Sequence, residues 1–165
     1  MSYKTKLAQI STFVFDVDGV LTNGTVMVTS EGELLRSMNI KDGYALKRAV
    51  DQGFRVAIIS GGTNEGVRKR LEGLGVTEIY LGAHEKTVFL DDYCQRNGVS
   101  LDEIAYMGDD IPDLPPLKQV GLSSCPQDAV AEVKAIVDYV SHKNGGQGCA
   151  RDLIEQVLKV HNKWI

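Results

Sequence analysis

Runs of about four to six apolar residues alternate along the chain with stretches of helical periodicity, and glycine, asparagine, aspartate and serine mark the joins. This is the pattern of βα units around a parallel sheet, so the sequence predicts an α/β fold with helices flanking a central sheet. Strands are expected at residues 12–15, 55–59, 79–81, 104–107 and 120–123, with a short one near 139. Helices are expected at 44–52, 65–74, 86–97, 114–119, 129–134 and 150–163.

One segment departs from the alternation. Residues 25–28 and 34–39 have the character of two strands, and the serine, glutamates and glycine at 30–33 supply turn chemistry between them. The segment 25–39 is therefore predicted to be a β-hairpin that projects from the sheet. No repeat, low-complexity tract or linker interrupts the sequence, so residues 1–165 are expected to form one domain.

Composition narrows the function classes. Hydrophobic residues make up 43% of the chain, but no apolar run approaches the length of a membrane span, and no apolar stretch follows the first lysines, so a cytoplasmic protein is expected. The net charge is −4 and the basic residues are scattered, which argues against a nucleic-acid partner and favours a small-molecule substrate. The three cysteines are widely spaced, without the pattern of a disulfide framework or zinc site.

Two acidic clusters directly follow predicted strands. Asp16 and Asp18 end the first strand, and Asp109, Asp110 and Asp113 follow the strand at 104–107. The carboxyl ends of parallel strands are where α/β sheets bind ligands, so the clusters would converge if these strands are neighbours. Carboxylate oxygens at that density suit Mg²⁺. Taken singly, either cluster is equally well explained as helix caps or turn residues.

Two further features fit the binding of a phosphate group. Ser60 and Gly61 lie between a predicted strand and helix, where a hydroxyl and backbone N–H groups favour an anion. Lys86 lies near the start of a predicted helix, where the helix dipole gives a cation no advantage, and it can neutralise a nucleophile and a bound phosphate together. Each feature alone is also compatible with an ordinary βα turn or a solvated lysine.

The order of these elements, DVDGVLT from Asp16, Ser60 with its glycines, Lys86, and GDDIPD from Gly108, resembles the four motifs of the haloacid dehalogenase superfamily. The resemblance implies a Rossmann-like core and an Mg²⁺-dependent phosphatase. Asp16 would be the nucleophile and Asp18 the general acid/base, with Ser60 and Lys86 holding the phosphate. Asp16, the backbone carbonyl of Asp18 and Asp109 would bind Mg²⁺, with Asp110 and Asp113 in support.

The motif spacing leaves no room for a cap domain. Asp18 and Ser60 are 42 positions apart, and Lys86 and Asp109 are 23 apart, so the active site is expected to lie open unless neighbouring subunits close it. The runs DVDGVLTNG, NIKDGY from 39 and GGQGCAR from 145 resemble the capless, tetrameric branch of 3-deoxy-D-manno-octulosonate 8-phosphate phosphatases. This implies a homotetramer assembled through the hairpin.

The same branch implies further substrate contacts. Gly146, Gly148 and Arg151 would reach a neighbouring subunit's site, or else form a glycine turn with a solvated arginine. Arg70 would bind the sugar-acid carboxylate through its guanidinium fork, or else lie on a solvated helix face. Relatives in this branch act on the 9-phosphate of nine-carbon sialic-type acids. Gly62 and Gly73, where some of those enzymes carry charged residues, favour the eight-carbon substrate.

Two other classes stay open on the sequence. Receiver domains of two-component signalling share an acidic pair, a phosphorylated aspartate, a Ser/Thr and a lysine, but their acidic pair closes the first strand, whereas Asp109 and Asp110 come last here. A non-catalytic binding subunit on the same fold is the other possibility. The presence of Asp16, Asp18, Lys86 and Asp109 together argues against it.

Overall fold

A six-stranded, wholly parallel sheet forms the centre of the molecule in a computed structural model, which describes residues 2–165. The strands of the chain are β1 (Thr12–Phe15), β2 (Met27–Val28), β3 (Leu34–Leu35), β4 (Arg55–Ile59), β5 (Glu78–Tyr80), β6 (Ile104–Met107), β7 (Leu122–Cys125) and β8 (Tyr139–Val140). The sheet order is β5-β4-β1-β6-β7-β8, while β2 and β3 pair with each other in an antiparallel hairpin. The predicted fold class, including the hairpin, is confirmed.

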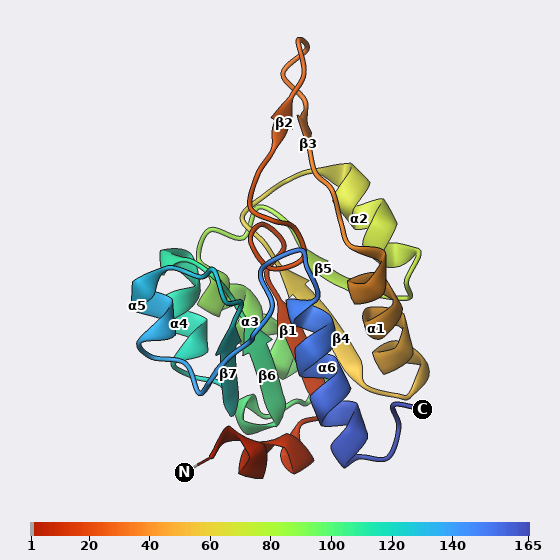
Figure 1. The fold of residues 1–165 in the computed structure, drawn as a ribbon, viewed down its shortest axis with the longest axis vertical. Coiled ribbons are helices and arrows are strands. Elements are labelled where there is room, and N and C mark those ends of the chain that lie inside the picture. Colours follow the sequence, from red (N-terminus) through yellow and green to blue (C-terminus); the bar gives the residue numbers. More distant parts are fainter. Residues whose placement is uncertain (1) are drawn as a thin grey trace.

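Helices cover both faces of the sheet (Figure 1). They are α1 (Ile40–Asp51), α2 (Glu65–Glu72), α3 (Lys86–Asn97), α4 (Leu114–Leu117), α5 (Ala131–Lys134) and α6 (Cys149–Val160), with 3₁₀ turns η1 (Tyr3–Gln9), η2 (Leu101–Glu103) and η3 (Ile111–Asp113). The apolar side chains of α1, α2 and α6 belong to one core cluster, and those of α3 and α5 to another. None of the described helices is long and apolar enough to cross a lipid bilayer.

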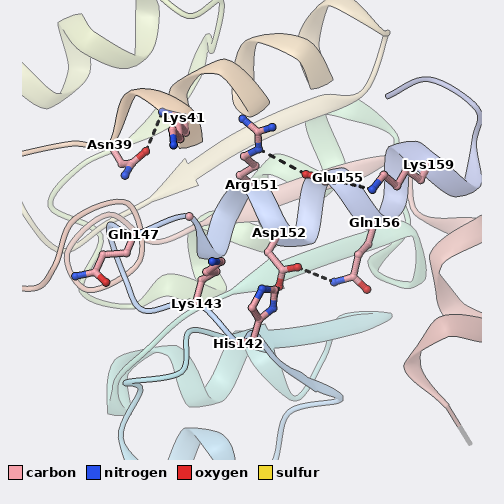
Figure 2. A pocket seen from close by; sticks show the side chains of 11 residues that line it. Asn39, Lys41, His142, Lys143, Gln147, Arg151, Asp152, Glu155, Gln156 and Lys159 are labelled. Atoms are coloured by element: carbon pink, nitrogen blue, oxygen red, sulfur yellow. Dashed lines mark hydrogen bonds and ion pairs between the residues drawn. The ribbon is translucent and has the colours of Figure 1, made fainter. Parts of the chain in front are cut away.

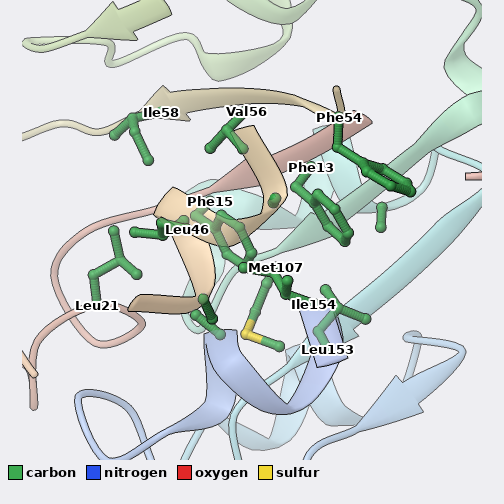
Figure 3. Close-up of a cluster of buried hydrophobic side chains, with 14 of the residues drawn as sticks. Phe13, Phe15, Leu21, Leu46, Phe54, Val56, Ile58, Met107, Leu153 and Ile154 are labelled. Atoms are coloured by element: carbon green, nitrogen blue, oxygen red, sulfur yellow. The ribbon is translucent and has the colours of Figure 1, made fainter. Parts of the chain in front are cut away.

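Successive residues of β1 point into opposite cores. Phe13 and Phe15 are fully buried with Met107 and with Leu153 and Ile154 of α6 (Figure 3), whereas Val14 is buried in the second core. A strand covered on both faces is mostly apolar, which explains the apolar runs in the sequence. Burying each side chain of this size contributes about 1.5–3 kcal/mol, so the strands are held firmly and their carboxyl ends form a rigid platform.

The hairpin projects away from the body of the molecule, beyond the carboxyl ends of the sheet strands (Figure 1). Its apolar side chains are exposed; Met27 retains 69% and Val28 64% of its accessible surface. The strands are shorter than predicted, since β3 ends at Leu35. The expected strand to 39 is wrong because Asn39 is instead the N-cap of α1, where its side chain accepts hydrogen bonds from the backbone N–H groups of Lys41 and Asp42.

The other differences from the predicted elements concern their ends. The α1 helix begins at Ile40 rather than at 44 because of its Asn39 cap. The β7 strand begins at Leu122 rather than at 120, because the N–H of Gly121 donates to the carbonyl of Leu101 in the turn before β6. The N-terminal turn η1 was not predicted. Ser2 starts it by accepting a hydrogen bond from the N–H of Lys4, a local device that apolar periodicity does not report.

Candidate active site

The two acidic clusters meet, because β1 and β6 are hydrogen-bonded neighbours and both clusters follow the carboxyl ends of these strands. They border a cleft of about 320 Å³. It is lined by Asp16, Asp18, Gly24, Ser60, Gly61, Gly62, Ala83, His84, Lys86, Asp109, Asp110, Pro112 and Asp113. The structure thus brings together all the predicted catalytic and metal-binding residues, and Gly62 of the predicted phosphate-binding turn lies with them. The lining residues Gly24, Ala83, His84 and Pro112 had not been predicted as site residues.

Asp16 follows the last residue of β1 and is largely buried. Its Oδ2 atom lies 2.9 Å from Nζ of Lys86, and its Oδ1 atom accepts a hydrogen bond of 2.7 Å from the N–H of Val17. Burial, followed by the charge of Asp113, raises the pKa of Asp16 to about 7, although Lys86 acts in the opposite direction. A carboxylate fixed in place and shielded from water is chemically suited to nucleophilic attack.

Lys86 is the first residue of α3 and its side chain is almost fully buried. Nζ donates a 2.7 Å hydrogen bond to Oδ1 of Asp113 while it also faces Asp16. Burial by itself would lower the pKa of Lys86, but the charges of Asp113 and Asp16 outweigh it and the pKa is raised. The side chain therefore remains a cation at neutral pH, able to bind an anionic group in the cleft.

Asp113 is fully buried, and its side chain connects several parts of the site. Its Oδ1 atom accepts hydrogen bonds from Lys86 and from the hydroxyl of Tyr106, and its Oδ2 atom accepts one of 3.0 Å from the N–H of Asp109. It thereby fixes the lysine to the loop that carries Asp109. Asp110 serves the same loop: its side chain accepts a hydrogen bond from the N–H of Ile111 and caps η3.

Asp109 has an oxygen that needs a partner. Its Oδ1 atom is buried and, among the described residues, accepts no hydrogen bond, a costly arrangement for a carboxylate. Burial, with the charges of Asp16 and Asp113, raises the pKa of Asp109 to about 8. One oxygen from each of these three carboxylates lies within 4.8 Å of the others. An all-oxygen donor set with an unsatisfied member fits Mg²⁺.

Gly19 explains the glycine of the first motif. Its φ is +87°, which favours glycine, and a Cβ atom there would lie 1.9 Å from Oδ2 of Asp109. The loop after β1 can therefore approach the second acidic cluster only without a side chain at this position. The tight turn closes on the carbonyl of Val17, which accepts from the N–H groups of Val20, Leu21 and Thr22.

Asp18 is held by a residue that the sequence analysis missed. The Arg36 guanidinium donates from Nε to Oδ1 of Asp18 at 2.8 Å and from Nη2 to Oδ2 at 2.9 Å. Arg36 follows β3 of the hairpin, so its partner depends on the path of the hairpin in space. A bidentate arginine–carboxylate pair has no sequence signal of its own, because the two residues lie in separate elements.

The remaining predicted substrate contacts lie outside the acidic cleft of their own chain. Arg70 lines a separate shallow depression, and its guanidinium lies against Gly43 of α1. The N–H of Gly146 donates to the carbonyl of Val20, and the N–H of Gly148 donates to the side chain of Asp42. None of Arg70, Gly146 and Gly148 lines the acidic cleft of its own chain, so their contact with substrate stays a prediction.

Arg151 borders a second cleft of about 560 Å³ beside α6 (Figure 2). Its guanidinium lies over the rings of Trp164 and Tyr44, and its Nε is 3.5 Å from the carboxylate of Glu155. The N–H of Arg151 donates to Asp42, which thereby caps the start of α6. Basic side chains gather in this cleft, including Lys41, His142 and Lys143.

Comparison with known proteins agrees with the class that the fold and the site define. The sequence model of haloacid dehalogenase-like hydrolases matches residues 73–153. Among solved structures, 3-deoxy-D-manno-octulosonate 8-phosphate phosphatase from Moraxella catarrhalis, in complex with a magnesium ion, a phosphate ion and KDO, superposes with a TM-score of 0.95 at 31% identity. The superposition covers 98% of this chain and 93% of that one.

Curated relatives give a finer assignment. The 3-deoxy-D-manno-octulosonate 8-phosphate phosphatase KdsC of Haemophilus influenzae is 35% identical over 158 residues, which cover 96% of this chain and 88% of the relative. The protein of the same name from Salmonella typhi is 34% identical over 159 residues, with 96% and 85% covered. The chain belongs to the haloacid dehalogenase superfamily and, within it, to the family of 3-deoxy-D-manno-octulosonate 8-phosphate phosphatases. The resemblance drawn from the motifs is confirmed at both levels.

Proposed function

We propose that this protein hydrolyses 3-deoxy-D-manno-octulosonate 8-phosphate to 3-deoxy-D-manno-octulosonate and phosphate through a phosphorylated Asp16. The observation that carries the proposal is the buried Asp16 carboxylate, fixed by Lys86 beside Asp109 and Asp113 in an open cleft, in a chain that matches phosphatases of this family over nearly its whole length. The arrangement supplies a nucleophile, a cation for the phosphate and a place for Mg²⁺.

The reaction proceeds in two displacements. An oxygen of Asp16 first attacks phosphorus, the bond from phosphorus to the sugar oxygen breaks, and Asp18 donates its proton to the departing alkoxide. Asp18 then takes a proton from water, whose oxygen attacks phosphorus and releases phosphate and the Asp16 carboxylate. Asp18 ends the cycle protonated, as it began.

Lys86 and Ser60 bind the phosphate throughout. The ammonium group of Lys86 faces Asp16 at 2.9 Å, so it neutralises the nucleophile before attack and the phosphoryl oxygens during it. The hydroxyl of Ser60, which accepts a 3.2 Å hydrogen bond from the N–H of Gly62, and the N–H of Gly61 are the groups that donate to the phosphate; both residues line the cleft. Asp16, Asp109 and the carbonyl of Asp18 would hold Mg²⁺, which offsets the negative charge of phosphate and carboxylates.

The exposed hairpin is the assembly element of this proposal. Val26, Met27, Val28, Leu34 and Leu35 all expose more than a third of their surface on an arm that leaves the body of the molecule. Apolar side chains in such a continuous exposed patch favour association, here into a cytoplasmic homotetramer. The segment with Gly146, Gly148 and Arg151 then reaches the open cleft of a neighbour, which supplies the closure that a cap domain would otherwise give.

A substrate panel tests the proposal. Phosphate release is measured with 3-deoxy-D-manno-octulosonate 8-phosphate, a nine-carbon 2-keto-3-deoxy acid 9-phosphate and glucose 6-phosphate, each in Mg²⁺ and in excess EDTA. We expect the highest kcat/KM with the eight-carbon acid and no turnover in EDTA until Mg²⁺ is restored. Preference for the nine-carbon acid would reassign the substrate, and absence of hydrolysis of any of them would reject the proposal.

A further inference from the structure

Arg36 and Asp18 form a partly buried bidentate ion pair that the two-displacement chemistry does not by itself explain. The Arg36 side chain is 9% exposed and that of Asp18 is 36% exposed. A guanidinium fork on both oxygens fixes the plane of a carboxylate as well as its position. Each carboxylate oxygen has two acceptor sites, so Asp18 keeps a free site on each oxygen for a proton from the cleft.

Contacts on several sides surround this pair. Gly62 lies next to it, since a Cβ atom built on Gly62 would be in ordinary contact, 3.4 Å from both Nη2 of Arg36 and Oδ2 of Asp18. Nη1 of Arg36 donates to the carbonyl of Leu34 at 2.8 Å, so every arm of the guanidinium is engaged. The arginine is therefore fixed at the same time as the carboxylate that it holds.

The same arginine links the hairpin to the catalytic loop. Across the part of the chain that the structure describes, hydrogen bonds join residues 26–38 to the rest of the molecule at two places: Arg36 to Asp18, and the side-chain amide of Asn64 to the carbonyl of Leu34 at 3.1 Å. Asn64 is also the N-cap of α2. The two links meet at Leu34, so a shift of the hairpin base moves Arg36 with it.

From this geometry we propose that Arg36 is a positioning residue, which transmits the placement of the hairpin to Asp18 and so sets the proton transfers of the reaction. The inference rests on the proposed role of Asp18 as acid/base. Arg36 is not among the residues that line the acidic cleft. It acts by holding the carboxylate where the leaving oxygen and the attacking water pass.

The test uses the leaving group. The parameter kcat/KM reports the steps up to formation of the phosphorylated Asp16; a sugar alkoxide needs a proton in those steps, whereas p-nitrophenolate leaves without one. In Arg36→Met we expect kcat/KM to fall about 10- to 100-fold with the sugar-acid phosphate and less than about threefold with p-nitrophenyl phosphate. Arg36→Lys, which keeps one charged donor, recovers part of the loss.

Matched variants make the test decisive. Arg96→Met removes an exposed arginine that also makes two ion pairs, with Asp92 and Glu78, and should leave kcat/KM unchanged for both substrates. Asn64→Asp keeps the cap acceptor of α2 but removes the donor to Leu34. Made in the parent, Asn64→Asp should lower kcat/KM for the sugar-acid phosphate relative to kcat/KM for p-nitrophenyl phosphate. Made in Arg36→Met, it should cause no further decrease in that ratio.

Equal losses on both substrates in folded Arg36→Met would overturn the inference, since that is the result of a purely structural role. If the effects of Asn64→Asp and Arg36→Met on kcat/KM were additive in the double variant, the proposed link between the hairpin and Asp18 would be overturned. The proposed function fails differently: the unmodified protein would then hydrolyse no sugar-acid phosphate at all.

Discussion

Asp16 combines two properties that oppose each other in an ordinary surface carboxylate. It is largely buried, which favours its neutral form, and it faces Lys86, which favours the charged form. The result is a carboxyl group with few competing water molecules around it and a fixed orientation in the cleft. A replacement that keeps the shape of Asp16 but removes its charge tests the role of the carboxylate in the reaction without changing the packing around it.

Asp16→Asn is such a replacement. We expect a loss of activity of roughly four orders of magnitude or more, since the amide cannot form the acyl phosphate. The folded protein should persist, because the change removes a buried charge that is crowded by Asp113. Phosphate release and thermal unfolding measure the two effects, with Asp51→Asn on the exposed surface as the matched control. Retained turnover would remove Asp16 from the role of nucleophile.

The carboxylates also make stability depend on pH and metal. Without a cation, the pKa values of Asp16 and Asp109 are raised to about 7 and about 8 from the ordinary value of 3.8. Between the ordinary pKa and the raised pKa values, the folded state therefore binds more protons than the unfolded state. The free energy of unfolding of the metal-free protein consequently decreases as the pH rises from about 4 to about 8. Mg²⁺ competes with those protons and replaces their effect.

Thermal unfolding in EDTA and in Mg²⁺ at pH 5 and pH 8 checks this linkage. The Tm in EDTA should fall by several degrees, on the order of 5 °C, between the two pH values, and the rise in Tm on adding Mg²⁺ should be larger at pH 8. Asp109→Asn should flatten both dependences. A pH dependence that is the same in Asp109→Asn and in the parent would show that other groups cause it.

At the scale of elements, the strands that build the site are those that the sequence predicts best. The runs at 12–15, 55–59 and 104–107 coincide with β1, β4 and β6, because strands buried on both faces are mostly apolar, with Thr12 and Arg55 only at the strand starts. The motifs that follow them are local, so Asp16, Ser60 and Asp109 were found as well. The pair of Arg36 and Asp18 was not, because it depends on the path that the chain takes in space as it returns from β3 of the hairpin.

The C-terminal segment shows the same limit. Gly145 packs against the loop after β1, and a Cβ atom there would lie 1.9 Å from the carbonyl oxygen of Gly19. Gly19 in turn lies against Asp109, so the glycine turn before α6 packs against the loop that contacts the acidic site. The sequence left a glycine turn here as one of two alternatives, and a contact between residues 19 and 145 follows only from the packing of the two loops.

Gly145→Ala should therefore disturb both folding and activity. Backbone must move to admit the methyl group, at a cost of about 1–3 kcal/mol, and the Tm should fall by roughly 3–10 °C. The displaced loop carries Gly19 into Asp109, so kcat should fall as well. Gly73→Ala is the matched control, because its Cβ would meet only ordinary contacts of 3.4 Å or more. A Gly145→Ala protein with parental Tm and kcat would contradict the proposed support.

At the scale of the whole molecule, association with other subunits would explain both the open cleft and the exposed hairpin. The cleft has no covering domain from its own chain, and the hairpin leaves apolar side chains without a partner among the described residues. Arg151 lies away from the acidic cleft of its own chain, beside a second cleft. If assembly brings that face to a neighbour's site, each complete active site contains residues of two chains.

Mixed oligomers of two variants test whether each active site contains residues of two chains. Asp16→Asn lacks the nucleophile but keeps Arg151, and Arg151→Ala keeps the nucleophile but lacks the arginine. Each should be weakly active or inactive alone, because in the proposed homotetramer every site of either variant misses one part. Co-expressed with two different affinity tags and purified through both, the mixed oligomer should regain activity, since some Arg151→Ala sites would then face an intact Arg151 of an Asp16→Asn neighbour.

The control is a mixture of Asp16→Asn with Lys86→Met. Both changes lie in the same cleft of the same chain, at 2.9 Å from each other, so no arrangement of the two chains makes a complete site and no activity should return. Recovery confined to the pair with Arg151→Ala would place the arginine in a neighbour's site. Equal activity of Arg151→Ala and the parent, or no recovery in its mixture, would confine Arg151 to its stacking on Trp164 and Tyr44 and leave each cleft to its own chain.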